Sequence, residues 1–400
     1  MNILMINPVH PQTAHISAVR AWQFAQGLAG LGHRVVLLTG TSPTGGQQAG
    51  NDLAAHDWSK PRVLAVDAGK QGKTRLPFPL NKVRTVWRMV IGGGAQGRWV
   101  HNGVQTVREN ASQFRPDVVW CTFGMMEAVF AARRAAKAFG CPWVLDIKDN
   151  WELYVPPGLR RLMVRRTRGW AAVTANAEFT ARKARIWQCS DAEAIYSGVD
   201  DVFFASLVRR GTVEECAITF VGSLYFPEHL AVLLEGIGRW HANLTEGEKG
   251  KVVVRYLGGD VAMFATAVRE CIPHVRTEAR GYVPTEELAA CCRGSKVNMY
   301  VAHQGGFHHK LLELLACGRP MLVYPGESEE SRRLVLEGGG ELLEPVSAVQ
   351  VAEMLAEVFF RESQTSHAPA AETSLRRYAW ENQSKALEKV LLKVVKDNER

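Results

Sequence analysis

One pattern recurs along the chain and restricts its fold more than any other feature. A short β-branched run leads through a glycine-bearing turn into a helical pattern, and a second such run follows. In the first copy, Ile3 to Asn7 precedes a helix from about Ser17, which Gly32 ends before the run Val35 to Thr39. Strands that alternate with helices lie parallel in one sheet, so the sequence predicts an α/β protein.

The pattern begins afresh near residue 218, which predicts two doubly wound, Rossmann-like halves. The 400 residues, 46% of them hydrophobic, suffice for two ordinary cores. We expect an amino-terminal domain of residues 1–204 and a carboxy-terminal domain of residues 205–378. Thr285 is expected to cap a helix at residues 286–292. Ligands of such sheets bind beyond the carboxyl ends of the strands, where loops lead into helices.

The stretch Gly305 to Pro320 places unusual polar residues at one of these loops. A strand at residues 296–301 and a turn at 303–308 lead into a helix from about His309 to Cys317, and a strand at 321–324 follows. The predicted helix is otherwise apolar. Its polar residues therefore require a separate explanation.

Lys310 and Glu313 suit a nucleotide at the start of this helix. Free backbone N–H groups and the full positive charge of Lys310 would hold a phosphate, which Gly305 and Gly306 allow the backbone to approach closely. Glu313 lies one turn deeper among leucines, where the two hydroxyls of a ribose would satisfy its carboxylate. The alternative for Glu313 is a salt bridge to a nearby cation or a helix-to-loop cap.

His308 and His309 precede Lys310 directly. One of them is expected to bond a phosphate or line the cleft, and the other to be exposed. Adjacent helical residues do not face the same way, and no Asp-x-Asp pair accompanies them, so metal ligation is not expected. We predict neither a metal nor another cofactor.

These residues resemble a known family, the GT-B glycosyltransferases, and within it the large family 4 of retaining enzymes. Glu313 with Ala316 to Pro320 is similar to the signature E-A-M-A-C-G-x-P, whose glutamate holds the donor ribose. The resemblance covers nearly the whole chain. Further matches are residues 32–35 with G-H-x-V, residues 198–203 with N-G-V-D-x-x-F, residues 220–222 at the start of the second domain, residues 281–288 with the base-contacting G-x-V-x-x-x-x-L loop, and residues 380–382 with a closing helix, here 379–400, that returns to the first domain.

Other positions depart from the family and indicate one branch of it. Ser223 and Glu228 replace the Arg and Lys that commonly neutralise the diphosphate, and Gly305 replaces a glutamate. Lys148 to Trp151 and His309 to Ala316 are similar to R-D-L-W and S-K-x-x-E-Y-L-A of a branch that includes bacterial N-acetylfucosaminyltransferases. In that branch the helix lysine would take over the neutralisation of phosphate.

The resemblance implies transfer of a hexosyl or N-acetylhexosaminyl group from a nucleoside diphosphate sugar, with retention of configuration and without a metal. The implied acceptor is a lipid-linked or cell-surface glycan precursor. Expected catalytic residues are Lys148, Asp149 and Lys310, where Asp149 is a candidate nucleophile and a loop cap beside Trp151 is its alternative. Expected acceptor-binding residues are His15 and Trp151. The expected donor-binding residues are Gly222, Ser223, Tyr282, Val283, Gly306, Phe307, His308, His309, Lys310 and Glu313.

The formal net charge of +8 is concentrated in two segments. Residues 60–110 hold ten Lys and Arg against two acidic residues, and residues 155–188 hold eight against Glu178 alone. Both are interleaved with apolar side chains, which suits anionic lipid headgroups, although a solvated helix face gives the same pattern. No nucleic-acid motif accompanies the charge. Without a signal peptide or a membrane-spanning run, we expect a cytoplasmic protein, peripheral on the inner face of the cell membrane.

Two other functions share the predicted fold. A nucleotide-sugar 2-epimerase would need paired acid and base carboxylates in the cleft. A non-catalytic GT-B scaffold is compatible with the missing Arg, Lys and first Glu, and it predicts weak or absent nucleotide binding. A dinucleotide-dependent oxidoreductase is disfavoured, since no G-x-G-x-x-G follows the first strand.

Overall fold

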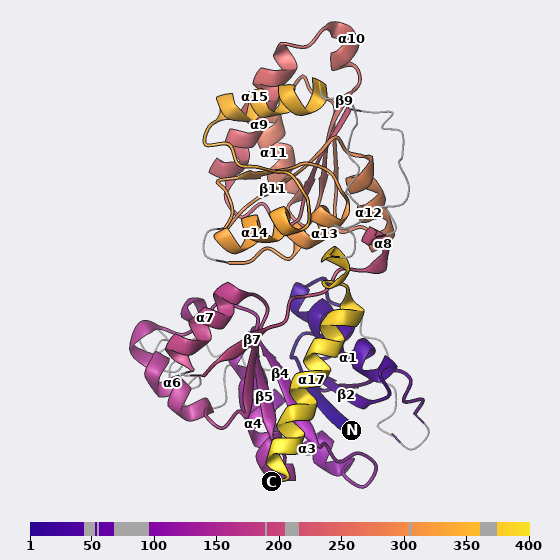
Figure 1. Ribbon diagram of the computed structural model, residues 1–400, viewed down its shortest axis with the longest axis vertical. Helices are drawn as coiled ribbons and strands as arrows, with labels where there is room; N and C mark the ends of the chain where they lie inside the picture. Colours follow the sequence, from indigo (N-terminus) through magenta and orange to yellow (C-terminus); the bar gives the residue numbers. More distant parts are fainter. Residues whose placement is uncertain are drawn as a thin grey trace. The chain divides into compact units, whose positions relative to one another are not determined.

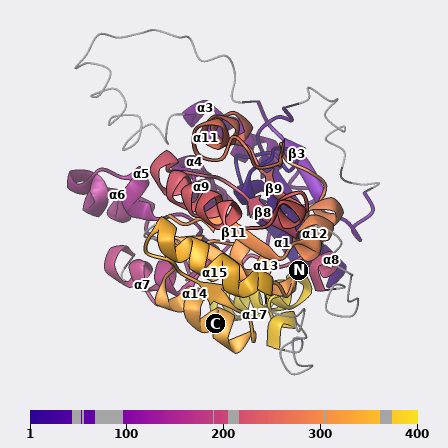
Figure 2. The same ribbon diagram turned by 90° about the horizontal axis from the view of Figure 1, so that it is seen from above.

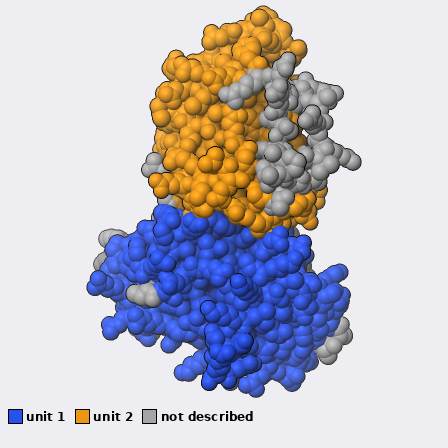
Figure 3. Space-filling view, in the orientation of Figure 1, with its two compact units in different colours: residues 1–198, 380–400 blue, residues 199–379 orange. Residues whose placement is uncertain are grey.

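The computed structural model describes residues 1–43, 53, 56–67, 96–188, 190–204, 216–303, 306–360 and 374–400. It divides into two compact units, coloured separately in Figure 3. The first unit comprises Met1–Gly198 with Trp380–Arg400, and the second comprises Val199–Ala379. The division falls a few residues before the boundary expected from the sequence, because the short helix α8 (Asp201–Phe204) packs on helices of the second unit and buries Phe203 and Phe204 there.

The first unit contains a seven-stranded parallel sheet in the order β3-β2-β1-β4-β5-β6-β7. Its strands are β1 (Asn2–Ile6), β2 (Arg34–Thr39), β3 (Arg62–Ala65), β4 (Val118–Phe123), β5 (Trp143–Ile147), β6 (Ala172–Ala175) and β7 (Ala192–Ala194). The strand order reverses between β1 and β4. Loops at the carboxyl ends of these two strands therefore border the crevice where doubly wound sheets bind ligands.

Helices cover both faces of this sheet (Figure 1). One core contains side chains of α1 (Ile16–Gly30) and α17 (Trp380–Asn398), and Ile3 and Met5 of β1 point into it. Leu4 and Ile6 point into the opposite core, as the alternation of side chains along a strand requires. That core is covered by α3 (Gly97–Glu109), α4 (Met126–Phe139), α6 (Arg160–Thr167) and α7 (Glu178–Trp187).

The second unit contains a six-stranded parallel sheet in the order β10-β9-β8-β11-β12-β13. Its strands are β8 (Cys216–Val221), β9 (Val252–Leu257), β10 (Thr277–Arg280), β11 (Val297–Val301), β12 (Met321–Tyr324) and β13 (Leu342–Leu343). Here the order reverses between β8 and β11. The loops after β8 and β11 thus border the expected ligand crevice of this unit.

One core of the second unit lies under α9 (Pro227–Ala242), α11 (Val261–Cys271) and α15 (Ala348–Phe360). Helices α9 and α15 run side by side in Figures 1 and 2. Gly236 allows this close approach, because a Cβ there would lie 2.3 Å from Val351 Cβ. Among the described residues, the unit also contains the helices α8, α10 (Glu246–Lys249), α12 (Thr285–Gly294), α13 (Lys310–Ala316) and α14 (Glu329–Glu337).

The predicted α/β class with two parallel, doubly wound sheets is confirmed. One local expectation is wrong: Thr285 does not cap α12 but is its first residue, and Pro284 stands at the cap position without a side-chain hydrogen bond. The ring of Pro284 fixes its φ, and this sets the backbone entry into the helix without a side-chain cap. Helix α13 is also shorter than predicted, because its first helical residue is Lys310 and its last is Ala316.

Candidate functional site

In the second unit, Lys310 lies at the point where the strand order reverses. Its Nζ donates to the carbonyl of Val221, the last residue of β8, at 3.3 Å. A Cβ on the adjacent Gly222 would lie 2.5 Å from the same Nζ. Gly222 also has φ of +79°, a backbone conformation that glycine adopts without steric cost. The fold thus places Lys310 of α13 against Gly222, the glycine that follows β8.

Aromatic rings surround the Lys310 ammonium. Nζ lies 5.1 Å from the ring centroid of Tyr300 and 5.7 Å from that of Tyr225. Within the described ranges, no carboxylate forms an ion pair with Lys310. The aromatic faces attract the cation but do not neutralise it. The arrangement leaves the charge available to an anionic ligand.

Burial lowers the pKa of Lys310 to about 8, and the carboxylates of Glu327, Glu313 and Asp260 offset part of that effect. The prediction that Lys310 carries a full positive charge therefore holds only below this pH. The cause is desolvation, which disfavours the ammonium form of a lysine. Since α13 has only seven residues, Lys310 rather than the helix dipole supplies most of the positive potential here.

Glu313 lies one turn after Lys310, as predicted, and its side chain is partly exposed. Its Oε1 lies 3.1 Å from His309 Nε2. His309 is therefore the nearby side chain that corresponds to the alternative left open by the sequence. Burial, and then the charge of Glu313, raise the pKa of Asp200. A partly exposed carboxylate in this setting can accept hydrogen bonds from a ligand hydroxyl.

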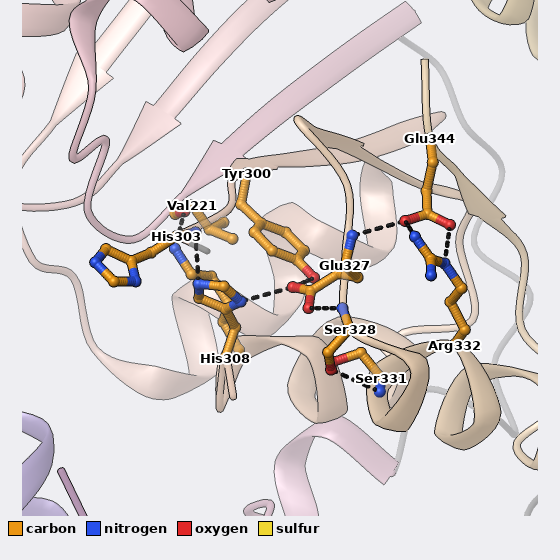
Figure 4. Close-up of polar contacts among 10 residues, drawn as sticks. Val221, Tyr300, His303, His308, Glu327, Ser328, Ser331, Arg332 and Glu344 are labelled. Atoms are coloured by element: carbon orange, nitrogen blue, oxygen red, sulfur yellow. Dashed lines mark hydrogen bonds and ion pairs between the residues drawn. The ribbon is translucent and has the colours of Figure 1, made fainter. Parts of the chain in front are cut away.

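His308 does not face a ligand, contrary to the prediction. Its ring is buried, its Nδ1 lies 2.6 Å from Glu327 Oε1, and its Nε2 accepts from the backbone N–H of His303 at 2.9 Å. Both ring nitrogens are therefore engaged within the protein (Figure 4). The sequence could not reveal this, because Glu327 lies 19 residues further along the chain.

Two residues that the sequence did not single out hold the loop after β8. The Tyr256 hydroxyl donates to the Gly222 carbonyl at 2.9 Å and accepts from the Asp260 N–H at 2.8 Å. The Asp260 carboxylate in turn accepts from the Leu224 N–H at 2.9 Å. These bonds satisfy the backbone on both sides of Ser223. The loop that is expected to contact the donor is therefore held in one conformation.

The other expected donor-binding residues border the same crevice. Tyr282 is exposed, and its hydroxyl would lie 3.1 Å from a Cβ on Gly259 in the loop after β9. Val283 and Ser223 are partly buried. Gly306 and Phe307 are partly exposed in the segment before α13, whereas Gly305 lies outside the described residues. The structure thus collects these residues at the carboxyl ends of β8, β9, β10 and β11.

The first unit brings three of its expected residues together. Lys148 Nζ forms an ion pair with Asp149 Oδ1 at 2.9 Å in the loop after β5. His15 caps α1 by accepting from the Ser17 N–H, and burial together with the Lys148 ammonium lowers its pKa. Gly124 leaves room for the carboxylate, since a Cβ there would lie 3.1 Å from Asp149 Oδ2. This cluster borders the crevice between β1 and β4.

Trp151 is not available to an acceptor, so that prediction is wrong. Its side chain is only 1% exposed, and its ring stacks on Phe123 with centroids 4.9 Å apart. Asn150 caps the short helix α5 (Trp151–Tyr154), which turns the indole into the core. Burial of a large aromatic ring against the sheet is more favourable than leaving the ring exposed beside a polar loop.

Comparisons with known proteins show which family and which solved structures the chain resembles. Residues 17–197 match the family described as glycosyl transferase 4-like domain. The chain resembles the structure of HepE from Anabaena in complex with UDP and glucose, with a TM-score of 0.67 at 14% identity, over 98% of this chain and 100% of that one. No curated protein matches the chain.

Two further solved structures have the same architecture. Sucrose-phosphate synthase from Thermosynechococcus elongatus gives a TM-score of 0.67 at 14% identity, over 98% of each chain. A UDP-forming trehalose-phosphate synthase from Burkholderia vietnamiensis gives 0.64 at 14% identity, over 99% of each chain. The fold is therefore that of the GT-B glycosyltransferases, as the sequence resemblance implied. The residues that match the glycosyl transferase 4-like domain, 17–197, lie within the first unit.

Proposed function

We propose that this protein transfers a glycosyl group from a nucleoside diphosphate sugar to a glycan precursor. The observation that carries the proposal is the position of Lys310, whose ammonium lies against Gly222 without a carboxylate partner among the described residues. Glu313 follows one helical turn later. A diphosphate would pair with the Lys310 ammonium, and a ribose diol would donate hydrogen bonds to the Glu313 carboxylate. The resemblance to HepE, which was solved with UDP-glucose, supports this donor class.

In the proposed reaction, the bond between the anomeric carbon of the sugar and the diphosphate oxygen breaks. Lys310 stabilises the negative charge that develops on the departing diphosphate. The acceptor oxygen forms the new glycosidic bond to that carbon, and the proton of the acceptor hydroxyl passes to the departing diphosphate oxygen. Because Lys310 supplies the required positive charge, we propose that the reaction needs no metal.

The first unit would supply the acceptor side of the reaction. Asp149, held by its ion pair with Lys148, is the candidate carboxylate for a retaining mechanism, which the family resemblance implies. Because His15 Nδ1 accepts from the Ser17 N–H, the neutral His15 ring carries its proton on Nε2. We assign both side chains to the acceptor-binding region.

A basic and apolar surface of the first unit favours a lipid-linked acceptor. On α6, Arg161, Arg165 and Arg166 are exposed beside Leu162, which is 41% exposed, and on α7 Ile186 is 62% exposed. Of the segment 60–110, residues 68–95 lie outside the described residues. None of the described helices combines the length and apolar character needed to span a membrane. We propose that α6 and α7 bind anionic lipid headgroups from one side of the bilayer.

A non-catalytic scaffold is the second candidate, favoured by Ser223 and Glu228 where related enzymes carry cations. Product analysis separates the possibilities. The protein is incubated with nucleoside diphosphate sugars and a lipid-linked acceptor extract, and the sugar is followed by mass spectrometry. Transfer to the acceptor is expected. Isomerised free donor would indicate an epimerase, and unchanged donor would favour the scaffold.

A further inference from the structure

The buried carboxylate of Glu327 bonds to side chains and backbone of the segments around Lys310. Its side chain is 1% exposed, and its Oε1 accepts from the Tyr300 hydroxyl at 2.7 Å and lies 2.6 Å from His308 Nδ1. Its Oε2 accepts from the Ser328 N–H at 3.2 Å. Figure 4 shows these contacts converging on one side chain. A buried charge so fully hydrogen-bonded is held in a single position.

The contacts of His308 determine which ring nitrogen carries its proton. Nε2 must accept, because its partner is the backbone N–H of His303. In the neutral imidazole the proton then resides on Nδ1 and is donated to Glu327. The His308 side chain thereby ties residue 308 to the backbone of His303 through a side-chain hydrogen bond.

The ring of His303 extends this link to the loop after β8. It stacks on Phe226 with centroids 5.8 Å apart at 25°, and it meets the edge of Tyr225 at 5.6 Å. Tyr225 has φ of +48°, an unfavourable conformation for a non-glycine residue, and its ring lies beside the Lys310 ammonium. Loops that follow β8, β11 and β12 are thus connected through Glu327, His308 and His303.

We propose that Glu327 and His308 are positioning residues, which hold the His303 backbone and with it the donor-binding loops around Lys310 before the nucleotide binds. The inference rests on the proposed function, since it assigns these residues to the same donor site. Ligand affinity depends on such preorganisation, because a loop that is already ordered loses less entropy on binding.

Two substitutions of His308 separate positioning from packing. Glutamine places an amide oxygen near the position of Nε2 and can accept from His303, whereas asparagine places its amide near Nδ1 and can reach only Glu327. Calorimetry with UDP, GDP and ADP identifies the nucleotide that binds the wild type. His308→Asn, which loses the bond to His303, should then weaken that affinity about tenfold, and His308→Gln, which keeps that bond but loses the one to Glu327, by a smaller factor of about three. The control is Arg333→Gln, which alters an ion pair with Glu337 within α14. It should leave the nucleotide affinity unchanged.

The outcomes distinguish the two proposals. Equal affinities for both His308 variants, or a greater loss with glutamine, would overturn the positioning role and leave the proposed function intact. If the wild type bound none of the three nucleotides, the proposed function would fail, and the inference with it. Nitrogen-15 NMR of histidine-labelled protein gives an independent test, because the signal lost in His308→Gln should report a proton on Nδ1. A proton on Nε2 would contradict the inference directly.

Discussion

The ammonium of Lys310 lies where a side chain on Gly222 would project, at the point between β8 and β11 where the strand order reverses. A methyl group on Gly222 would approach Nζ to 2.5 Å and Cε to 3.0 Å. The positive φ of Gly222 imposes a second requirement for glycine at the same position. One residue therefore permits both the turn of the backbone and the placement of the cation.

Replacing Gly222 should impair folding and nucleotide binding together. Gly222→Ala is expected to lower the free energy of unfolding by about 1–3 kcal/mol, through the left-handed backbone and the displaced lysine. We also expect about tenfold weaker nucleoside diphosphate binding, since Nζ must move. Urea unfolding and calorimetry measure the two effects. Gly247→Ala, in a position where a Cβ meets no atom within 4 Å, is the control, and similar losses in both variants would contradict the explanation.

The lowered pKa of Lys310 predicts a pH dependence of donor binding. The ammonium attracts the diphosphate, and with a pKa of about 8 it loses its proton as the pH rises from 7 to 9. The terminal phosphate, with a pKa of about 6, is already about nine-tenths ionised at pH 7, so its own charge changes little over this range. Affinity measured by calorimetry should therefore fall with rising pH. Lys310→Met should bind more weakly and show no such slope. A wild-type affinity that is constant to pH 9 would refute the assignment.

A buried ion pair in the first unit lies just before the Lys148–Asp149 loop. Arg20 Nη2 lies 2.7 Å from Asp146 Oδ1, both side chains have no exposed surface, and Asp146 also accepts from Thr174. Asp146→Asn would leave the guanidinium without a counter-charge, which should lower the free energy of unfolding by about 3–5 kcal/mol. Urea unfolding tests this. Asp191→Asn, in an exposed pair with Arg185, should cost less than about 1 kcal/mol, and equal effects would rule out the buried pair as the cause.

Local sequence patterns predicted most of the fold. The strand Met321–Tyr324 coincides with its predicted range, and the helix Ile16–Gly30 begins one residue before its predicted start, because apolar periodicity and a following glycine or proline are local signals. Thr285 was misassigned as a cap because its residue type favours that position. The structure begins the helix one residue earlier, after Pro284.

The candidate site was predictable only where a residue acts through its own position in the chain. Lys310 and Glu313 share one helix, so their spacing indicated a common face. The partners of His308 and the Gly222 loop come from distant segments, at Glu327, Tyr256 and Asp260, and no local pattern connects them. The pKa of Lys310 likewise depends on burial, which arises only from the tertiary structure.

The exposed arginines of α6 should direct binding to anionic membranes. Changing Arg161, Arg165 and Arg166 together to Glu removes about 1 kcal/mol of attraction for each arginine. Sedimentation with phosphatidylglycerol vesicles should then show more than about a hundredfold weaker binding, since about 3 kcal/mol is lost. The control changes the exposed Lys389, Lys393 and Lys396 of α17 to Glu, with the same change in charge. Equal loss in both variants would show that only the net charge matters.

Titration of nucleotides into the wild type and Glu313→Ala tests the central claim most directly. UDP, GDP, ADP and their mono-sugars are added without magnesium and followed by calorimetry, with Glu353→Ala on the exposed side of α15 as the control. We predict that one nucleotide binds selectively and that Glu313→Ala alone weakens it by about 1–3 kcal/mol, the cost of losing a charged hydrogen-bond acceptor. Absence of nucleotide binding, or an affinity unchanged by Glu313→Ala, would contradict a donor site at Lys310 and Glu313 and favour the non-catalytic scaffold.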